Sequence, residues 1–183
     1  MTALFTRARL YGLTAAAITF AADQALKHYV VEGLGLRKMG DHHDLLSFFD
    51  FTRTNNYGVS LGMFEATSME MRLVLVALTA LIACGVLVWI MREVKAWDIA
   101  GLSLILGGAC GNIVDRWRFG YVVDFLDLHF GEFRPFLIFN LADAAITIGV
   151  VILLFRALFM GEKSATEQDQ ILADETRGDQ TNA

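Results

Sequence analysis

Apolar and polar positions fall into long separate blocks along this chain. Stretches that are nearly free of charge occupy residues 10–31, 72–92, 97–115 and 137–160. About 20 mostly apolar residues are needed for a helix to cross a bilayer core of roughly 30 Å. In lipid the backbone polar groups must be bonded within the protein, and four segments are too few to close a barrel. The pattern therefore predicts a mainly α membrane protein, a bundle of four transmembrane helices.

The connections between these stretches have their own patterns. The longest one, residues 32–71, contains "FFDFTRTNN" at 48–56, where aromatic and polar residues alternate before an Asn-rich turn. This predicts a small β-sheet on the membrane surface. A second loop, 116–136, is expected on the same side of the membrane. Residues 1–160 would then form a single four-span domain, and the polar, acidic residues 161–183 a disordered tail.

Composition supports a small integral membrane protein. The chain has 183 residues, 55% of them hydrophobic, with a mean hydropathy of +0.48 and a single proline. Such values exclude an ordinary soluble domain. Arg7 and Arg9 before the first apolar stretch, with "FAAD" at 20–23, resemble a cleavable signal peptide. The polar residues that follow continue the helical pattern, so an uncleaved first span is preferred. The two arginines favour a cytoplasmic N-terminus, and an even number of spans places both termini there.

Several polar residues lie at the ends of the most apolar stretches. Asn112 lies three and four positions before Asp115 and Arg116, and Asn140 lies three before Asp143, so each set is expected on one helix face. One interpretation is structural: asparagines bond across helices, and Asp115 with Arg116 makes a charge-compensated pair. Direct chemistry is the other, because a carboxylate beside hydrocarbon costs several kcal/mol.

Asp124 and Asp143 have no basic residue within four positions. Two carboxylates brought together near a low-dielectric boundary hold one proton between them. One could accept a proton from an attacking water while the other donates to a scissile carbonyl. If they meet, the two aspartates predict an aspartic protease. The histidines lack metal-ligand spacing, so neither a metal nor a cofactor is predicted, and no nucleic-acid partner is indicated.

Five blocks of sequence resemble, in order, those of bacterial lipoprotein signal peptidase, also called signal peptidase II. The resemblance covers roughly residues 10–160 and departs from the family at Leu61, where an aromatic residue is usual. The blocks are "ADQALK" (22–27), "NYGVSLGMF" (56–64), "GGACGNIVDR" (107–116), "VVDF" (122–125) and "FNLADAAITIG" (139–149).

The resemblance implies an intramembrane aspartic endopeptidase of the bacterial inner membrane. It would remove signal peptides from prolipoproteins by cutting before a diacylglyceryl-modified cysteine, with its site near the periplasmic face and the surface sheet as a β-cradle. Membrane lipids and cyclic peptide inhibitors of the globomycin type are the other implied partners. The implied roles are a catalytic dyad of Asp124 and Asp143, a substrate and inhibitor pocket of Asn56, Asn112, Arg116 and Asn140, and structural positions at Asp23 and Asp115.

Two other classes of function remain as alternatives. Intramembrane Asp and Asn also mark ion pathways, so a small proton-coupled transporter or channel subunit is one. Transporter sites tend to lie near the membrane midplane within internal repeats, whereas these polar pairs lie near span ends. A non-catalytic scaffold is the other, and it predicts that Asp124→Asn and Asp143→Asn damage folding as much as activity.

Overall fold

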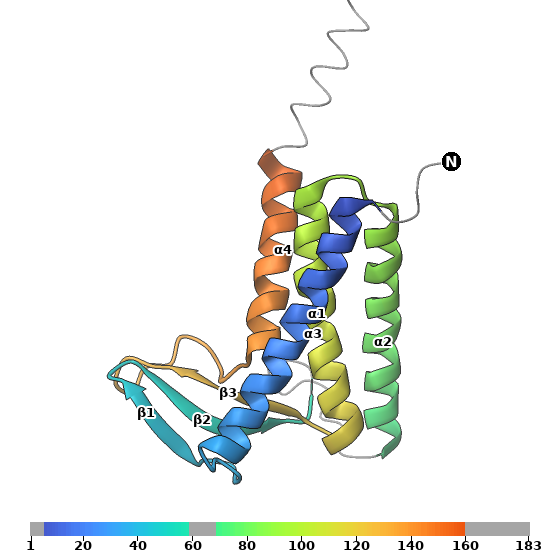
Figure 1. The fold of residues 1–183 in the computed structure, drawn as a ribbon. Helices are drawn as coiled ribbons and strands as arrows, with labels where there is room; N and C mark the ends of the chain where they lie inside the picture. Colours follow the sequence, from blue (N-terminus) through green and yellow to red (C-terminus); the bar gives the residue numbers. More distant parts are fainter. Residues whose placement is uncertain (1–5, 59–68, 160–183) are drawn as a thin grey trace, which may run out of the picture.

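In the part of the chain that the structure describes, four long helices lie side by side and alternate in direction (Figure 1). The computed structural model describes residues 6–58 and 69–159, so Leu61 and the acidic tail lie outside the described residues. Helix α1 begins and α4 ends at the same end of the bundle, as expected for an even number of passes. The helices are α1 (Arg7–His28), α2 (Met69–Arg92), α3 (Ala96–Phe119) and α4 (Leu141–Phe159).

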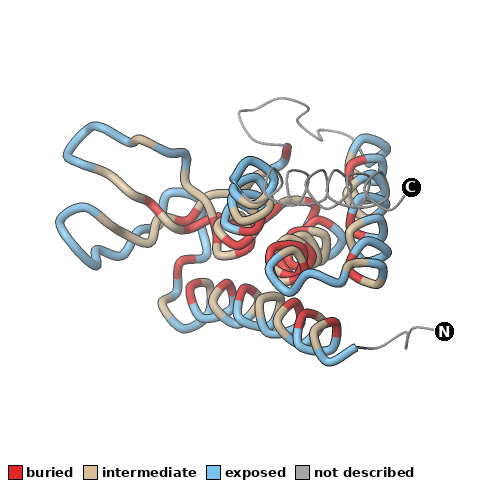
Figure 2. The backbone as a smooth tube through the Cα atoms, turned by 90° about the horizontal axis from the view of Figure 1, so that it is seen from above, coloured by how far each residue is buried: buried red, intermediate tan, exposed pale blue. Residues whose placement is uncertain are grey.

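Helix α3 is the centre of the bundle and packs against the other three helices. Many of its residues are therefore buried, as the red segments at the centre of the bundle in Figure 2 show. Glycines allow the close approach: a Cβ at Gly101 would lie 2.9 Å from the carbonyl oxygen of Gly149 on α4. A Cβ at Gly108 would overlap the carbonyl of Ala142. Small residues bring backbones together in this way in membrane bundles.

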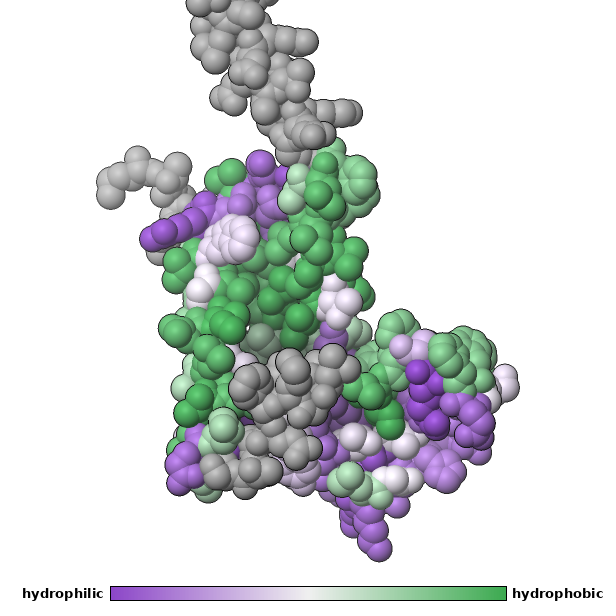
Figure 3. Space-filling model, turned by 180° about the vertical axis from the view of Figure 1, so that it is seen from behind, coloured by the Kyte–Doolittle hydropathy of each residue, from purple (hydrophilic) through white to green (hydrophobic). Residues whose placement is uncertain are grey.

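The outer faces of the helices are apolar. Side chains such as Leu73, Leu78 and Leu81 of α2 are exposed, and hydrophobic atoms cover much of the helical region in Figure 3. By length and composition, α2, α3 and α4 are each apolar enough to cross a membrane. Helix α1 is not among these three, because charged residues interrupt it. Three of the four predicted spans thus correspond to helices that are long and apolar enough to cross a membrane, and the first span remains a prediction.

A three-stranded antiparallel sheet lies at the end of the bundle where α1 ends and α4 begins (Figure 1). Its strands are β1 (His42–Leu46), β2 (Phe49–Asn56) and β3 (Val122–Leu128), in that order across the sheet. The predicted sheet is confirmed, but its assignment to the first loop alone is wrong, since β3 comes from the second loop. The first four residues of β3 are all buried, so this strand lacks the alternation that revealed its partner.

Two helix boundaries differ from the prediction. Helix α3 continues to Phe119 and ends at Gly120, which adopts a left-handed conformation with φ of 87°. Arg116 is therefore helical and does not belong to a loop beginning at 116. Helix α4 begins at Leu141 and not at 137, because Phe139 instead pairs with Leu126 beside β3. Apolar content alone does not distinguish a membrane helix from a buried extended segment.

Candidate active site

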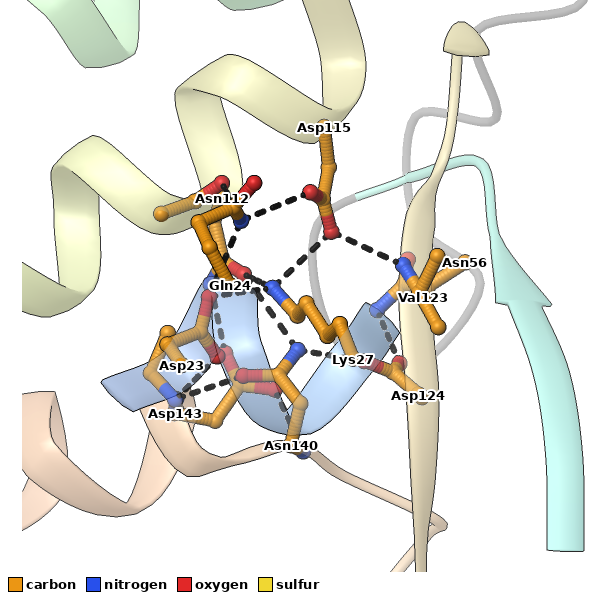
Figure 4. Close-up of polar contacts among 12 residues, drawn as sticks. Asp23, Gln24, Lys27, Asn56, Asn112, Asp115, Val123, Asp124, Asn140 and Asp143 are labelled. Carbon is orange, nitrogen blue, oxygen red and sulfur yellow. Dashed lines mark hydrogen bonds and ion pairs between the residues drawn. The ribbon is translucent and has the colours of Figure 1, made fainter. Parts of the chain in front are cut away.

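Asp124 and Asp143 come from different elements and are brought together by one asparagine. Asp124 lies in β3, whereas Asp143 lies in the first turn of α4. Asn140 donates from its Nδ2 to Asp124 Oδ1 at 2.6 Å, and its Oδ1 accepts from the backbone N–H of Asp143 at 2.9 Å. Figure 4 shows the two aspartates on either side of Asn140. The sheet and the bundle therefore meet at this site.

Asn140 also caps α4. Its side-chain oxygen bonds the N–H of Asp143, and the Asp143 carboxylate accepts in return from the Asn140 N–H at 3.4 Å. This reciprocal pattern is a capping box, which satisfies N–H groups that a helix leaves unpaired at its start. The expectation that Asn140 and Asp143 share one face of a helix is wrong in detail, because Asn140 precedes the helix. The cap still places the two side chains together.

Two further asparagines donate to the carboxylates. Asn112 of α3 donates from Nδ2 to Asp143 Oδ1 at 2.8 Å. Asn56, at the end of β2, donates to Asp124 Oδ2 at 3.0 Å and accepts from the N–H of Gly58 at 3.1 Å. Each aspartate is thus held by neutral amide donors, which orient a carboxyl group without fixing a charge on it as a salt bridge would.

The two aspartates differ in how far they are buried. Asp124 is only 2% exposed, whereas Asp143 is half-buried. Burial, and then the negative charge of Asp143, raises the pKa of Asp124 to about 7, against the opposing hydrogen bonds from Asn140 and Asn56. Asp124 therefore keeps a proton at a pH where an ordinary aspartate is ionised. A protonated and an ionised carboxyl group side by side can act as general acid and general base.

Arg116 reaches the same region from α3. Its Nη2 donates to the carbonyl oxygen of Gly58 at 2.8 Å, and the residue is 9% exposed. The buried Nε has no hydrogen-bond partner among the described residues. The Asp143 carboxylate is close enough for its charge to act on the guanidinium. Arg116 can therefore offer a positive charge beside the two carboxyl groups, and a donor that no described residue occupies.

The structural interpretation of the sequence expected Asp115 to pair with its neighbour Arg116, but the structure shows a different partner. Its salt-bridge partner is Lys27, at 2.8 Å, which also lies 2.8 Å from Asp23. Asp23 accepts from the N–H of Ala142 at 3.0 Å, and Asp115 accepts from the N–H of Val123 at 3.2 Å. These aspartates thus hold the starts of α4 and β3, the two elements that carry Asp143 and Asp124.

Lys27 and Gln24 were not singled out from the sequence. Gln24 donates to Asp23 at 3.2 Å and to Asp115 at 3.0 Å, so it bridges the same pair of carboxylates. The spacing of Asp23 and Lys27, four apart on one helix, was the available signal. Within the described part of the chain, no group of three or more His, Cys, Asp and Glu side chains could hold a metal ion.

Comparison with known proteins identifies relatives over most of the chain. Residues 15–159 match the family described as signal peptidase (SPase) II. The chain is 53% identical to a lipoprotein signal peptidase of Sphingopyxis alaskensis over 154 residues, covering 84% of this chain and 88% of that protein. It is 51% identical to a lipoprotein signal peptidase of Rhizorhabdus wittichii, with 84% and 89% covered.

Solved structures resemble the fold as well. Two crystal structures of a bacterial membrane enzyme, at 2.3 and 1.9 Å resolution, superpose with TM-scores of 0.70 and 0.69. Each is 26% identical to this chain and covers 81% of it. This chain in turn covers 87% of the first structure and 93% of the second. The similarity therefore extends over most of the chain.

Proposed function

The chain belongs to the signal peptidase II family of lipoprotein signal peptidases, and on that premise we propose that Asp124 and Asp143 are its catalytic dyad. The enzyme is an intramembrane aspartic endopeptidase that removes signal peptides from prolipoproteins, and the transporter alternative finds no support among its relatives. The observation that carries the dyad is the Asn140 side chain, which bonds Asp124 at 2.6 Å and the Asp143 N–H at 2.9 Å.

The unequal burial of the dyad assigns the two roles. Asp143, which is half-buried, takes a proton from a water whose oxygen attacks the carbonyl carbon of the scissile peptide bond. Asp124, protonated up to a pH of about 7, gives its proton to the carbonyl oxygen. As the tetrahedral intermediate collapses and the C–N bond breaks, Asp143 gives its proton to the amino group of the departing cysteine, and Asp124 takes a proton back from a hydroxyl group of the intermediate as that group becomes the new carbonyl. The starting protonation of the dyad is restored with no covalent intermediate.

Neutral amides and one arginine surround the dyad and would bind the substrate backbone. We assign Asn56, Asn112 and Asn140 to this role because each has an amide group bonded directly to Asp124 or Asp143. Arg116 has a buried Nε without a hydrogen-bond partner among the described residues, which could donate to a peptide carbonyl. Cyclic peptides of the globomycin type would bind at the same place. Asp23 and Asp115 support the site structurally through their backbone contacts.

We further infer that α1 is a fourth membrane span. Arg9, Asp23 and Lys27 interrupt its apolar sequence, but all three are buried in the bundle and so are turned away from lipid. Residues 1–160 would then form one membrane domain with both termini in the cytoplasm and the sheet as a periplasmic cradle. In that orientation the dyad lies near the outer face of the inner membrane. Lipid chains of the substrate would add roughly 0.8 kcal/mol of binding per buried methylene.

Cleavage of a diacylglyceryl-modified prolipoprotein by the purified protein in detergent tests this proposal. The comparison uses the unlipidated substrate and the Asp124→Asn and Asp143→Asn variants at matched folded yield. Asp127→Asn is the control, because Asp127 is 1% exposed in the same strand but bonds Arg134 and Thr52 instead of the dyad. We expect cleavage of the lipidated substrate only, lost in both dyad variants and retained in the control. Substantial turnover by either dyad variant would refute the assignment.

A further inference from the structure

Lys27 lies deep in the bundle, next to the dyad. It belongs to α1, is 4% exposed, and its ammonium group lies 2.8 Å from carboxylate oxygens of both Asp23 and Asp115. Two negative charges on one positive charge leave this cluster with a net charge of about −1. An ammonium group has three N–H donors, and these two salt bridges use two of them.

The third donor reaches the site. Lys27 Nζ lies 3.3 Å from Asn112 Oδ1, and Figure 4 shows the lysine extending from α1 into the group of polar residues around the dyad. The same oxygen accepts from Asn140 Nδ2 at 3.2 Å. With two donors on its oxygen side, the Asn112 amide must present its NH₂ group in the other direction, where it donates to Asp143 Oδ1 at 2.8 Å.

The orientation of this amide matters for the proposed general base. If Asn112 were flipped, its NH₂ would face the donors of Lys27 and Asn140, and its oxygen would face the Asp143 carboxylate. An ammonium group has no acceptor, so Lys27 opposes the flip more firmly than a neutral donor–acceptor group such as an amide could. The contact therefore links a buried charge on α1 to the position of Asp143 on α4.

We propose that Lys27 is a positioning residue for catalysis, which acts through the Asn112 amide to orient the Asp143 carboxylate. The inference rests on the proposed dyad. A purely structural role would require only that Lys27 neutralise Asp23 and Asp115. The two roles make different predictions when the charge balance of the cluster is kept and the contact with Asn112 is removed.

Lys27→Met combined with Asp115→Asn makes this separation. The single Lys27→Met variant leaves two buried carboxylates without a cation and is expected to fold poorly. The double variant restores a net charge of about −1, and Gln24 still donates to Asp23. We expect it to fold, with a thermal unfolding temperature near that of Asp115→Asn alone. Relative to Asp115→Asn alone, the kcat of the double variant on lipidated prolipoprotein should fall about 10- to 100-fold, because misplacement of a reacting group costs roughly this much. Its KM should change less than about threefold.

A double-mutant cycle with Asn112→Ala tests the route of the effect. If Lys27 acts through Asn112, adding Lys27→Met to an Asp115→Asn, Asn112→Ala background should lower kcat no further. A folded Lys27→Met, Asp115→Asn variant with the kcat of Asp115→Asn would overturn the proposal, as would a full multiplicative loss in the Asn112→Ala background. Asp124→Asn, measured in the same assay, reports on the dyad separately. Activity in that variant would sink the proposed function, whatever the result at Lys27.

Discussion

Asn140 Nδ2 donates to Asp124 Oδ1 at 2.6 Å while Asn140 Oδ1 accepts from the Asp143 N–H at 2.9 Å. One amide group thus caps α4 and spans the dyad at the same time. Because a helix start is fixed by its cap, the position of Asp143 relative to Asp124 depends on both ends of a single side chain. The stability of α4 and the geometry of the dyad are thereby coupled, and substitutions at Asn140 can separate them.

Asn140→Ser keeps an oxygen that can cap α4 but removes the amide donor to Asp124. Serine is as good a cap as asparagine, so we expect nearly unchanged thermal stability. Loss of a preorganised donor in the site should lower kcat by about 100-fold. Asn140→Ala removes both functions, and should show the same loss of activity with an additional cost of about 1 kcal/mol in the free energy of unfolding. If serine retained full activity, the donor to Asp124 would not be needed.

The pKa of Asp124 predicts a pH limit to activity. Burial and the charge of Asp143 raise this pKa to about 7 in the free enzyme, so kcat/KM should decline as pH rises through that value and the general acid loses its proton. The raised pKa also affects stability. The contribution from Asp124 is fully present below its ordinary pKa of 3.8 and is lost as pH rises to about 7.

A pH–rate profile of the wild-type enzyme and of Asp127→Asn checks this prediction. Asp127 lies in β3 with Asp124 but bonds Arg134, so its replacement should leave the decline near pH 7 in place. A profile that stays flat to pH 9 in the wild-type enzyme would contradict the assignment of Asp124 as the general acid.

The helices could be predicted from the sequence because lipid demands long uncharged segments, and three of the four satisfy that test in the structure. The sheet was predicted only where aromatic and polar residues alternate, in β2. Strand β3 could not be predicted in this way, because Val122, Val123, Asp124 and Phe125 are all buried. Its sequence therefore lacks the alternation of polar and apolar residues that identifies a strand with one exposed face. The contacts among α1, α3 and β3 depend on tertiary packing and cannot be predicted from the spacing of residues within one segment. The salt bridge between Lys27 and Asp115 is an example.

The site residues were visible as polar side chains in apolar surroundings, which is costly without a task. Asp124 and Asp143 stood out because neither has a basic residue nearby in sequence. Asn140 was identified, but its role as a cap was missed, since the apolar residues before it extended the predicted helix back to 137. In the structure, Phe139 pairs with Leu126 of β3 instead.

Glycines at helix contacts should differ sharply from glycines that face lipid. A Cβ at Gly108 would overlap the carbonyl of Ala142, the residue before Asp143, whereas a Cβ at Gly85 meets no atom within 4 Å. We expect Gly108→Ala to destabilise the protein by about 1–3 kcal/mol through overpacking. Gly85→Ala should be neutral or stabilising by roughly 0.5 kcal/mol, because alanine restricts the unfolded chain. Thermal unfolding in one detergent compares them, and equal stability would argue against tight α3–α4 packing at this point.

Gly120 ends α3 in a crowded place. Its φ of 87° is left-handed, and a Cβ there would lie 2.7 Å from Arg72 Nη1. Arg72 donates to the last carbonyl groups of α3, at 3.0 Å to that of Arg116 and at 2.9 Å to that of Trp117, which stabilises the helix end. Gly120→Ala should therefore combine backbone strain of about 1 kcal/mol with displacement of Arg72.

Gly131→Ala is the matched control, because Gly131 also has a positive φ, of 63°, but a Cβ there would meet nothing within 4 Å. It should show the strain alone, so its free energy of unfolding should fall by less than that of Gly120→Ala. Arg72→Leu separates the remaining effect: in that background the difference between the two alanine variants should largely disappear. If the difference persisted, Gly120 would be required for its backbone conformation alone, and the Arg72 contact would contribute little to the end of α3.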